Sequence, residues 1–217
     1  MKILFAASEA APYVKTGGLG DVAASLPQAL AGHREDEVAV FLPLYSAVRE
    51  KHQFNLTFLC SFYVPLAWRN QYCGLFCDSS DTGNLRHYFI DNEYYFARDN
   101  LYGYGDDGER FAFFSKAVLE ALQHLNWYPD VIHANDWQTA MLPVFLNAFF
   151  RSVPEYRPVR TLFTIHNIEY QGKAGSDFVC DVLGLDSSWA GVMEYDGCTN
   201  MMKAALLEAD RISTVSH

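Results

Sequence analysis

The sequence predicts an α/β fold, with a mostly parallel sheet flanked by helices and a small antiparallel insertion. The first observation is that short apolar runs alternate with longer stretches whose apolar residues recur at helical spacing. This alternation is typical of strands and helices that follow one another around a parallel sheet. The second is composition, because half of the 217 residues are apolar, which is enough for a sizeable core. The chain is therefore expected to fold as a globular protein.

The first half of the chain predicts a strand, a long loop and a helix, followed by further strands. The apolar run Ile3–Ala7 is typical of a buried parallel strand, and Leu19–Leu30 carries apolar residues at helical spacing. A second strand is predicted over Glu37–Leu42. Shorter strands, separated by polar or glycine-containing turns, are predicted around 54–65, 71–77 and 86–91. These middle segments are expected to form the antiparallel insertion.

The second half returns to the alternating pattern. A helix is predicted from Glu109 because one helical stripe collects the apolar residues Phe111, Phe114, Val118, Leu122 and Leu125. The elements predicted after it are a strand over Val131–His133, a helix over 138–150, a strand over 160–165, a helix over Asn200–Ala209 and a strand over Arg211–Val215. No repeat or obvious linker divides the sequence, so residues 1–217 are expected to form one domain.

Charge and cysteine usage restrict the class of protein. The 26 acidic and 16 basic residues give a net charge of −10, which argues against a nonspecific nucleic-acid binder. Five cysteines without a CxxC pair do not fit a disulfide scaffold, and Cys73 and Cys77 are expected to pack in the core rather than bind a metal. The apolar part of MKILFAASEA is too short for a signal peptide, and no apolar run reaches membrane-spanning length. A cytoplasmic protein with no metal site and no nucleic-acid or membrane partner is predicted.

The stretch KTGGLGDV, Lys15 to Val22, lies between the first strand and the first helix and formally contains G-x-G-x-x-A. A dinucleotide fingerprint is disfavoured because a loop from Ser8 to Thr16 precedes the glycines, and the second strand ends in FLPLYS without an acidic residue. A Walker phosphate loop is excluded because Lys15 precedes the glycines instead of following them.

A phosphate or diphosphate site is the remaining functional interpretation of this loop. The glycines at 17, 18 and 20 allow the backbone to approach a ligand and direct N–H groups at it, and the helix N-terminus favours anionic oxygens. Lys15 adds a full positive charge. A plain turn with a solvated lysine is the alternative.

Polar side chains also gather after two predicted strands, and ligands bind at the carboxyl ends of strands in α/β sheets. The stretch DVIHANDWQTA contributes His133, Asn135, Asp136, Trp137 and Gln138, and LFTIHNIEYQG contributes His166, Asn167, Tyr170 and Gln171. Asp136 could serve simply as a helix N-cap. Its carboxylate could equally hold sugar hydroxyls or stabilise a developing positive charge.

These stretches resemble motifs of the bacterial glycogen synthase and plant starch synthase family, which are retaining GT-B glucosyltransferases. The motifs KTGGLGDV, PDVIHANDWQTA, TLFTIHNIEYQG and EADRISTVS occur in the order of that family, and FARDNLYGYGDDGERFAFFSKAVLEAL resembles the stretch before the second motif. The similarity spans essentially the whole chain. It implies two Rossmann-like domains that face each other across a cleft. Residues 1–217 would form the N-terminal, acceptor-side domain, with the C-terminal nucleotide-binding domain absent.

The resemblance also implies a reaction and roles for individual residues. The reaction is transfer of glucose from ADP-glucose to the non-reducing end of an α-1,4-glucan, with retention of configuration. Asp136 and His166 match residues that are important for catalysis at the transferred glucose. The residues implied for the donor are Lys15, Gly17, Gly18 and Asn167, and those implied for the acceptor or sugar are Asp21 and Tyr102.

The resemblance implies no cofactor beyond the donor substrate. The partners that it implies are a nucleotide sugar, an α-1,4-glucan such as glycogen or starch, and the protein's own C-terminal domain. That domain supplies cationic groups for the leaving diphosphate, so the isolated chain is predicted to be inactive. Two alternatives remain. One is a sugar- or glucan-binding module that has the GT-B half-fold and does no chemistry, and the other is a different GT-B glucosyltransferase.

Overall fold

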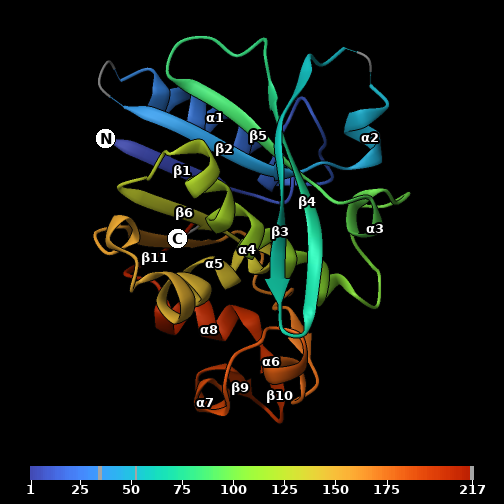
Figure 1. Cartoon of the computed structure of the whole chain (residues 1–217), viewed down its shortest axis with the longest axis vertical. Coiled ribbons are helices and arrows are strands. Elements are labelled where there is room, and N and C mark those ends of the chain that lie inside the picture. The colour runs from blue at the N-terminus through green and yellow to red at the C-terminus, as the bar shows by residue number, and fades with distance from the viewer. Residues whose placement is uncertain (34–35, 52, 216–217) are drawn as a thin grey trace.

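The computed structural model describes residues 1–33, 36–51 and 53–215. Within these residues, eight strands form one sheet in the order β11-β7-β6-β1-β2-β5-β4-β3 (Figure 1). The strands are β1 (Lys2–Ala6), β2 (Glu37–Pro43), β3 (Leu56–Leu66), β4 (Arg69–Asp78), β5 (Leu85–Asp91), β6 (Val131–Asn135), β7 (Arg160–Ile165) and β11 (Arg211–Thr214). Neighbouring strands from β11 through β5 are parallel, which confirms the predicted mostly parallel sheet.

The predicted antiparallel strands are present, and they extend the main sheet rather than forming a layer of their own. Strand β5 pairs parallel with β2 and antiparallel with β4, and β4 pairs antiparallel with β3. Strands β3 and β4 form a long hairpin whose turn reaches towards α6 (Phe178–Asp181) (Figure 1). There the guanidinium of Arg69 donates to the carbonyl oxygen of Asp181, with 3.0 Å between Nη1 and O.

Helices flank the sheet, and the predicted ones are found with small shifts of their ends. The helices at predicted positions are α1 (Gly18–Ala31), α4 (Asp107–Leu125), α5 (Met141–Phe145) and α8 (Met201–Glu208). The short helices α2 (Ser46–Arg49), α3 (Glu93–Phe96), α6 and α7 (Ala190–Met193) were not predicted. Helix α8 begins after Asn200, whose side chain accepts a hydrogen bond from the N–H of Lys203 at 2.9 Å. Asn200 is therefore the N-cap of this helix.

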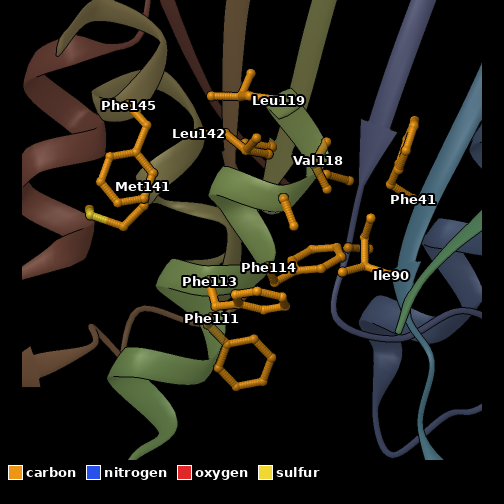
Figure 2. Close-up of a cluster of buried hydrophobic side chains, with 14 of the residues drawn as sticks. Phe41, Ile90, Phe111, Phe113, Phe114, Val118, Leu119, Met141, Leu142 and Phe145 are labelled. Atoms are coloured by element: carbon orange, nitrogen blue, oxygen red, sulfur yellow. The ribbon is translucent and has the colours of Figure 1, made fainter. Parts of the chain in front are cut away.

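Helix α4 provides much of the core between the sheet and α5. Its aromatic stripe lies beside Phe41 of β2 and Ile90 of β5 on one side and Met141 of α5 on another (Figure 2). Phe111, Phe113 and Phe114 are all buried. The helix ends at Asn126, whose φ of +47° is left-handed, a conformation that asparagine tolerates better than most residues.

The single helix predicted over 138–150 is interrupted. A 3-10 turn at Trp137–Thr139 leads into α5, which continues as a π-helical turn at Leu146–Phe150. Pro143 lies in the first turn of α5, where its missing N–H would have had no acceptor within the helix. The apolar pattern revealed a buried helical segment, but it did not reveal these changes of hydrogen-bond spacing.

A second, three-stranded sheet was not predicted. It is formed by β8 (Lys173–Ala174), β10 (Cys198–Asn200) and β9 (Glu194–Tyr195), and Figure 1 shows β9 and β10 beside α6 and α7 at one end of the molecule. Its strands are two or three residues long, too short for an alternating pattern to be recognised.

The parallel strands determine where a site can form. The carboxyl ends of β1, β6 and β7 lie at the same edge of the sheet because these strands are adjacent and parallel. The segments that follow them are the glycine loop, the HANDWQ segment and the HNIEYQG loop. All three sequence-predicted site segments are therefore neighbours in space.

No helix among the described residues has the length and apolarity needed to cross a membrane.

Candidate functional site

A cavity of about 750 Å³ lies at this edge of the sheet. Its size falls within the range typical of small-molecule sites. Five segments line it: the loop after β1 with the start of α1, the loop before α4 with the first residue of that helix, the turn after β6, the loop after β7 and the residue after β11. The lining residues are Glu9, Thr16, Gly17, Gly18, Leu19, Val22, Tyr102, Gly103, Asp107, Asp136, Trp137, Gln138, His166, Asn167, Tyr170 and Val215.

The structure brings most of the sequence-predicted site residues together here. Those that line the cavity are Gly17, Gly18, Tyr102, Asp136, His166 and Asn167. Lys15 and Asp21 are not part of the lining. Instead, the Lys15 ammonium lies 2.7 Å from both carboxylate oxygens of Asp21, and both side chains are exposed. The lysine is therefore held next to the glycine loop by an ion pair on the outer side of α1.

Glu9 is the main residue that sequence analysis missed. Its side chain is 2 % exposed, and its carboxylate accepts hydrogen bonds from the backbone N–H groups of Thr16 at 2.8 Å and of Gly17 and Gly20, each at 3.1 Å. The Thr16 hydroxyl donates to it as well. Three N–H groups of the loop therefore point at an internal anion, which corrects the expectation that the whole loop directs its N–H groups at a ligand.

The N–H groups of Gly18 and Leu19 differ from these. Both residues line the cavity, and in the first turn of α1 their N–H groups have no acceptor within the helix. They are the positions at which the helix N-terminus can bind an anionic oxygen. The sequence signal for Glu9 was an acidic residue three positions after the end of β1 and before the glycines.

The glycines of the loop serve different purposes. A Cβ atom on Gly20 would lie 2.8 Å from Cγ of Lys15, so this glycine allows the lysine side chain to pack over the start of α1. A Cβ atom on Gly18 would meet nothing within 4 Å. Packing against Lys15 therefore requires a glycine at position 20, whereas Gly18 leaves open space in the cavity wall.

Asp136 has an unusual backbone and an anchored side chain. Its φ of +59° and ψ of 177° lie in a region that is almost exclusive to glycine. Its carboxylate makes no N-cap bond, so the N-cap alternative is wrong; instead Oδ1 accepts from the N–H groups of His166 at 2.7 Å and Asn167 at 3.1 Å. The buried carboxylate thus ties the turn after β6 to the loop after β7.

Burial has the largest effect on the pKa of Asp136 and raises it, because desolvation disfavours the charged form. The two backbone N–H donors and the nearby His166 act in the opposite direction. The pKa of His166 is lowered, again mainly by burial, while Asp136 opposes this shift. The neutral imidazole is therefore favoured at His166 near pH 7.

His166 makes a further contact with the strand beneath it. Its Nε2 lies 2.9 Å from Oδ1 of Asn135, the last residue of β6. His133, two residues earlier, does not line the cavity. It is buried against Phe5, and its Nε2 lies 2.7 Å from the Thr164 hydroxyl oxygen. His133 is therefore a core histidine, and burial lowers its pKa to about 4.

Tyr102 links the loop before α4 to the end of β1. Its hydroxyl oxygen lies 2.7 Å from Oγ of Ser8, and it donates to Glu9 over 3.4 Å. Burial is the largest cause of the raised pKa of Tyr102, so the phenol stays protonated. Its hydroxyl therefore remains available as a hydrogen-bond donor beside Glu9.

The cavity wall is rich in carboxylates. Glu9, Asp107 and Asp136 all line it, and Asp107 also accepts from the N–H of Gly103 at 2.7 Å. Carboxylates of this kind accept hydrogen bonds from sugar hydroxyls, and the aromatic rings of Trp137 and Tyr170 add apolar surface. Among residues 1–33, 36–51 and 53–215, no cluster of three His, Cys, Asp or Glu side chains is arranged to hold a metal.

A family model and the curated relatives agree on the class of protein. The starch synthase catalytic domain family model matches residues 2–217. Glycogen synthases from Ligilactobacillus salivarius and Desulfitobacterium hafniense are 43 % and 47 % identical over 218 and 219 residues, covering all of this chain but 45 % and 46 % of their own lengths. The chain therefore spans slightly less than half the length of these curated relatives.

A solved structure has the same fold. The catalytic domain of Starch Synthase IV from Arabidopsis thaliana, bound to ADP and acarbose, superposes with a TM-score of 0.86 at 29 % identity. The match covers 99 % of this chain and 44 % of that one. All the cavity-lining residues except Glu9 come from the same stretches that resembled the family motifs. The chain thus belongs to the starch synthase catalytic domain family and forms an α/β domain of that fold.

Proposed function

We propose that this chain is the acceptor-side half of a retaining glucosyltransferase that transfers glucose from ADP-glucose to the non-reducing end of an α-1,4-glucan. Membership of the family and the ADP and acarbose bound to the Arabidopsis relative support the proposal. One observation carries it within this chain: a cavity with anchored Asp136 and half-buried His166 on one side and the start of α1 on the other.

The chemistry fits this arrangement. Breaking a glycosyl phosphate bond builds positive charge on the sugar and negative charge on the departing diphosphate. The Asp136 carboxylate is held by two N–H donors, so it can face the positive charge without reorganising. Gly17, Gly18 and Lys15 lie on the side where the diphosphate would bind, and Asn167, Asp21 and Tyr102 are assigned to contacts with the donor or the acceptor sugar.

A second domain completes the proposed enzyme. The glycogen synthase relatives are more than twice as long as this chain, and the proposal assigns the nucleotide pocket and the cations for the leaving group to the part beyond it. Loss of one preorganised donor costs about 10²–10³ in rate. We therefore expect no measurable transfer by the 217-residue chain alone. A cytoplasmic location belongs to the same proposal.

The test is incorporation of labelled glucose into glycogen by the longest reading frame that contains this chain. ADP-glucose and UDP-glucose are compared, with Lys15→Ala and Asp136→Ala as site variants. The exposed residues Arg157 and Glu155 provide charge-matched controls as Arg157→Ala and Glu155→Ala. Activity that disappears in both site variants and survives in both controls supports the proposal. A folded full-length protein that binds glucan but transfers no glucose from either donor would favour a binding module.

A further inference from the structure

We propose that Asn135 is a positioning residue that fixes the tautomer of His166, so that Nδ1 of this histidine is presented to the ligand as a hydrogen-bond acceptor. The tautomer follows from the contacts of Asn135 alone. The further step, in which Nδ1 accepts a hydrogen bond from a sugar hydroxyl, rests on the proposed function. Asn135 itself does not line the cavity and is fully buried.

The orientation of the Asn135 amide is determined by two backbone carbonyls. Its Nδ2 donates to the carbonyl oxygen of Ala6 at 3.0 Å and to that of His133 at 3.2 Å. The opposite orientation would place Oδ1 against two carbonyl oxygens and leave the amide N–H groups without these acceptors, which is costly for a buried group. Oδ1 is therefore the atom that faces the ring of His166.

The amide orientation determines which nitrogen of His166 carries the proton. Oδ1 of Asn135 can only accept, and it lies 2.9 Å from Nε2 of His166. Nε2 must therefore carry its hydrogen. A neutral imidazole has one N–H, so Nδ1 keeps its lone pair. Within the described part of the chain, no protein donor makes a hydrogen bond to Nδ1.

Burial favours a neutral ring at His166 and outweighs the charged group beside it. Desolvation disfavours the imidazolium, and His133 beneath it is neutral near pH 7 because burial lowers its pKa to about 4. Asp136 acts in the opposite direction, and Glu9 is the next carboxylate that faces Asp136. A neutral His166 with an unprotonated Nδ1 accepts a hydrogen bond from a hydroxyl group, and it does not donate a proton from that atom.

Neither aspartate nor alanine at position 135 would satisfy the same contacts. Aspartate has no N–H group for the carbonyls of Ala6 and His133, and its charge would favour the imidazolium. Alanine would leave Nε2 without its acceptor and allow both tautomers. Because Asn135 immediately precedes Asp136, the end of β6 places the tautomer-fixing group next to the anchored carboxylate.

The tautomer can be measured in this chain without any ligand. Long-range ¹H–¹⁵N correlation spectra of the ¹⁵N-histidine-labelled protein distinguish the Nε2–H from the Nδ1–H form, and His166→Gln identifies the signals. In the wild type we expect the Nε2–H form to exceed the other by at least tenfold at neutral pH. A predominant Nδ1–H form in the wild type would overturn the proposal.

Variants then test whether Asn135 is the cause. We expect Asn135→Ala to reduce the tautomer ratio at least fivefold and Asn135→Asp to raise the His166 pKa by at least one unit, a tenfold change in its protonation equilibrium. Asn147→Ala is the matched control, because Asn147 binds Glu208 and not a histidine. A folded Asn135→Ala protein whose tautomer ratio stays within twofold of the wild type would contradict the assignment.

The same variants separate this inference from the proposed function. In the full-length enzyme, Asn135→Asp is expected to shift the acidic limb of the pH profile to higher pH, while Asn147→Ala leaves the profile unchanged. A wild-type Nδ1–H tautomer in an active transferase would reject the role of Asn135 and leave the function standing. The expected tautomer in a protein that transfers no glucose would support the role of Asn135 and reject the function.

Discussion

The buried carboxylate of Glu9 accepts a hydrogen bond from the backbone N–H of Gly20, with 3.1 Å between Oε1 and N. The same carboxylate also binds the N–H groups of Thr16 and Gly17, so a single side chain from the end of β1 holds the glycine loop together. An anion thus already occupies the inner side of the loop. Under the proposed function, the donor diphosphate would bind at the other side of the loop, towards Lys15 and the first turn of α1.

We therefore expect Glu9→Gln to destabilise the chain. The amide retains one acceptor but turns an NH₂ group towards backbone N–H donors, and an unsatisfied buried donor costs about 1–3 kcal/mol. This corresponds to a fall in melting temperature of about 2–12 °C for a domain of this size. Thermal unfolding, with exposed Glu155→Gln as the control, measures the effect. Amide exchange at Gly17 and Gly20 should accelerate in the same variant, and an unchanged exchange rate would contradict the contact.

Replacing Asp136 with asparagine separates the structural role of this side chain from the role of its charge. Asp136→Asn keeps a carbonyl oxygen for the N–H groups of His166 and Asn167, so we expect the free energy of unfolding to change by less than about 1.5 kcal/mol. Loss of the charge should reduce glucose transfer by the full-length enzyme at least about 100-fold. Calorimetry and the glycogen assay give the two values. A variant that keeps a tenth or more of the activity would show that the charge is dispensable.

The stability of the chain should depend on pH through His133. Burial lowers the pKa of this histidine to about 4, whereas in the unfolded chain it is about 6.5. Between these values the unfolded state binds the proton and the folded state does not, so the free energy of unfolding rises with pH from about 4 to 6.5. Each unit of pKa difference corresponds to about 1.4 kcal/mol, which gives a contribution of about 3 kcal/mol across this window.

Denaturant unfolding of the wild type and of His133→Gln at pH 4.5, 5.5 and 7 isolates this contribution. His166 acts in the same direction as His133 and Asp136 in the opposite one, but both are present in the two proteins and cancel in the difference. We expect the wild type to lose more stability than the variant on acidification. Parallel curves would show that His133 titrates normally in the folded chain.

Much of the site could be predicted because one rule governs it. Adjacent parallel strands bring their carboxyl ends to one edge, so polar residues after β1, β6 and β7 had to be neighbours, and Asp136 and His166 both line the cavity. Glu9 was missed because its burial depends on a loop that folds back over the end of β1. Sequence spacing does not reveal which anion the loop N–H groups will meet.

The local backbone after β6 shows a second limit. A helix pattern correctly identified buried residues over 138–150, but the positive φ of Asp136 and the π-helical turn depend on tertiary contacts. The N-cap alternative for Asp136 rested on a local preference, and the hydrogen bonds from His166 and Asn167 override it. Side-chain contacts between different loops decide the details that local patterns leave open.

Gly18 and Gly20 form a matched pair that tests the two sides of the loop. A Cβ atom on Gly20 would lie 2.8 Å from Cγ of Lys15, near the base of that side chain, so the lysine has to move. A Cβ atom on Gly18 meets nothing within 4 Å, and alanine is a better helix former than glycine by about 1 kcal/mol. Gly20→Ala should therefore lower the melting temperature, whereas Gly18→Ala should leave it unchanged or raise it slightly.

Both substitutions are expected to weaken donor binding by the full-length enzyme, but for different physical reasons. Gly20→Ala displaces the Lys15 ammonium, so its effect on the donor KM should shrink as salt concentration rises and the charge is screened. Gly18→Ala places a methyl group in the cavity wall, where it blocks approach sterically at every salt concentration. Donor KM values at 50 and 500 mM salt measure the difference. An equal salt dependence in the two variants would show that the donor does not bind between Lys15 and the start of α1.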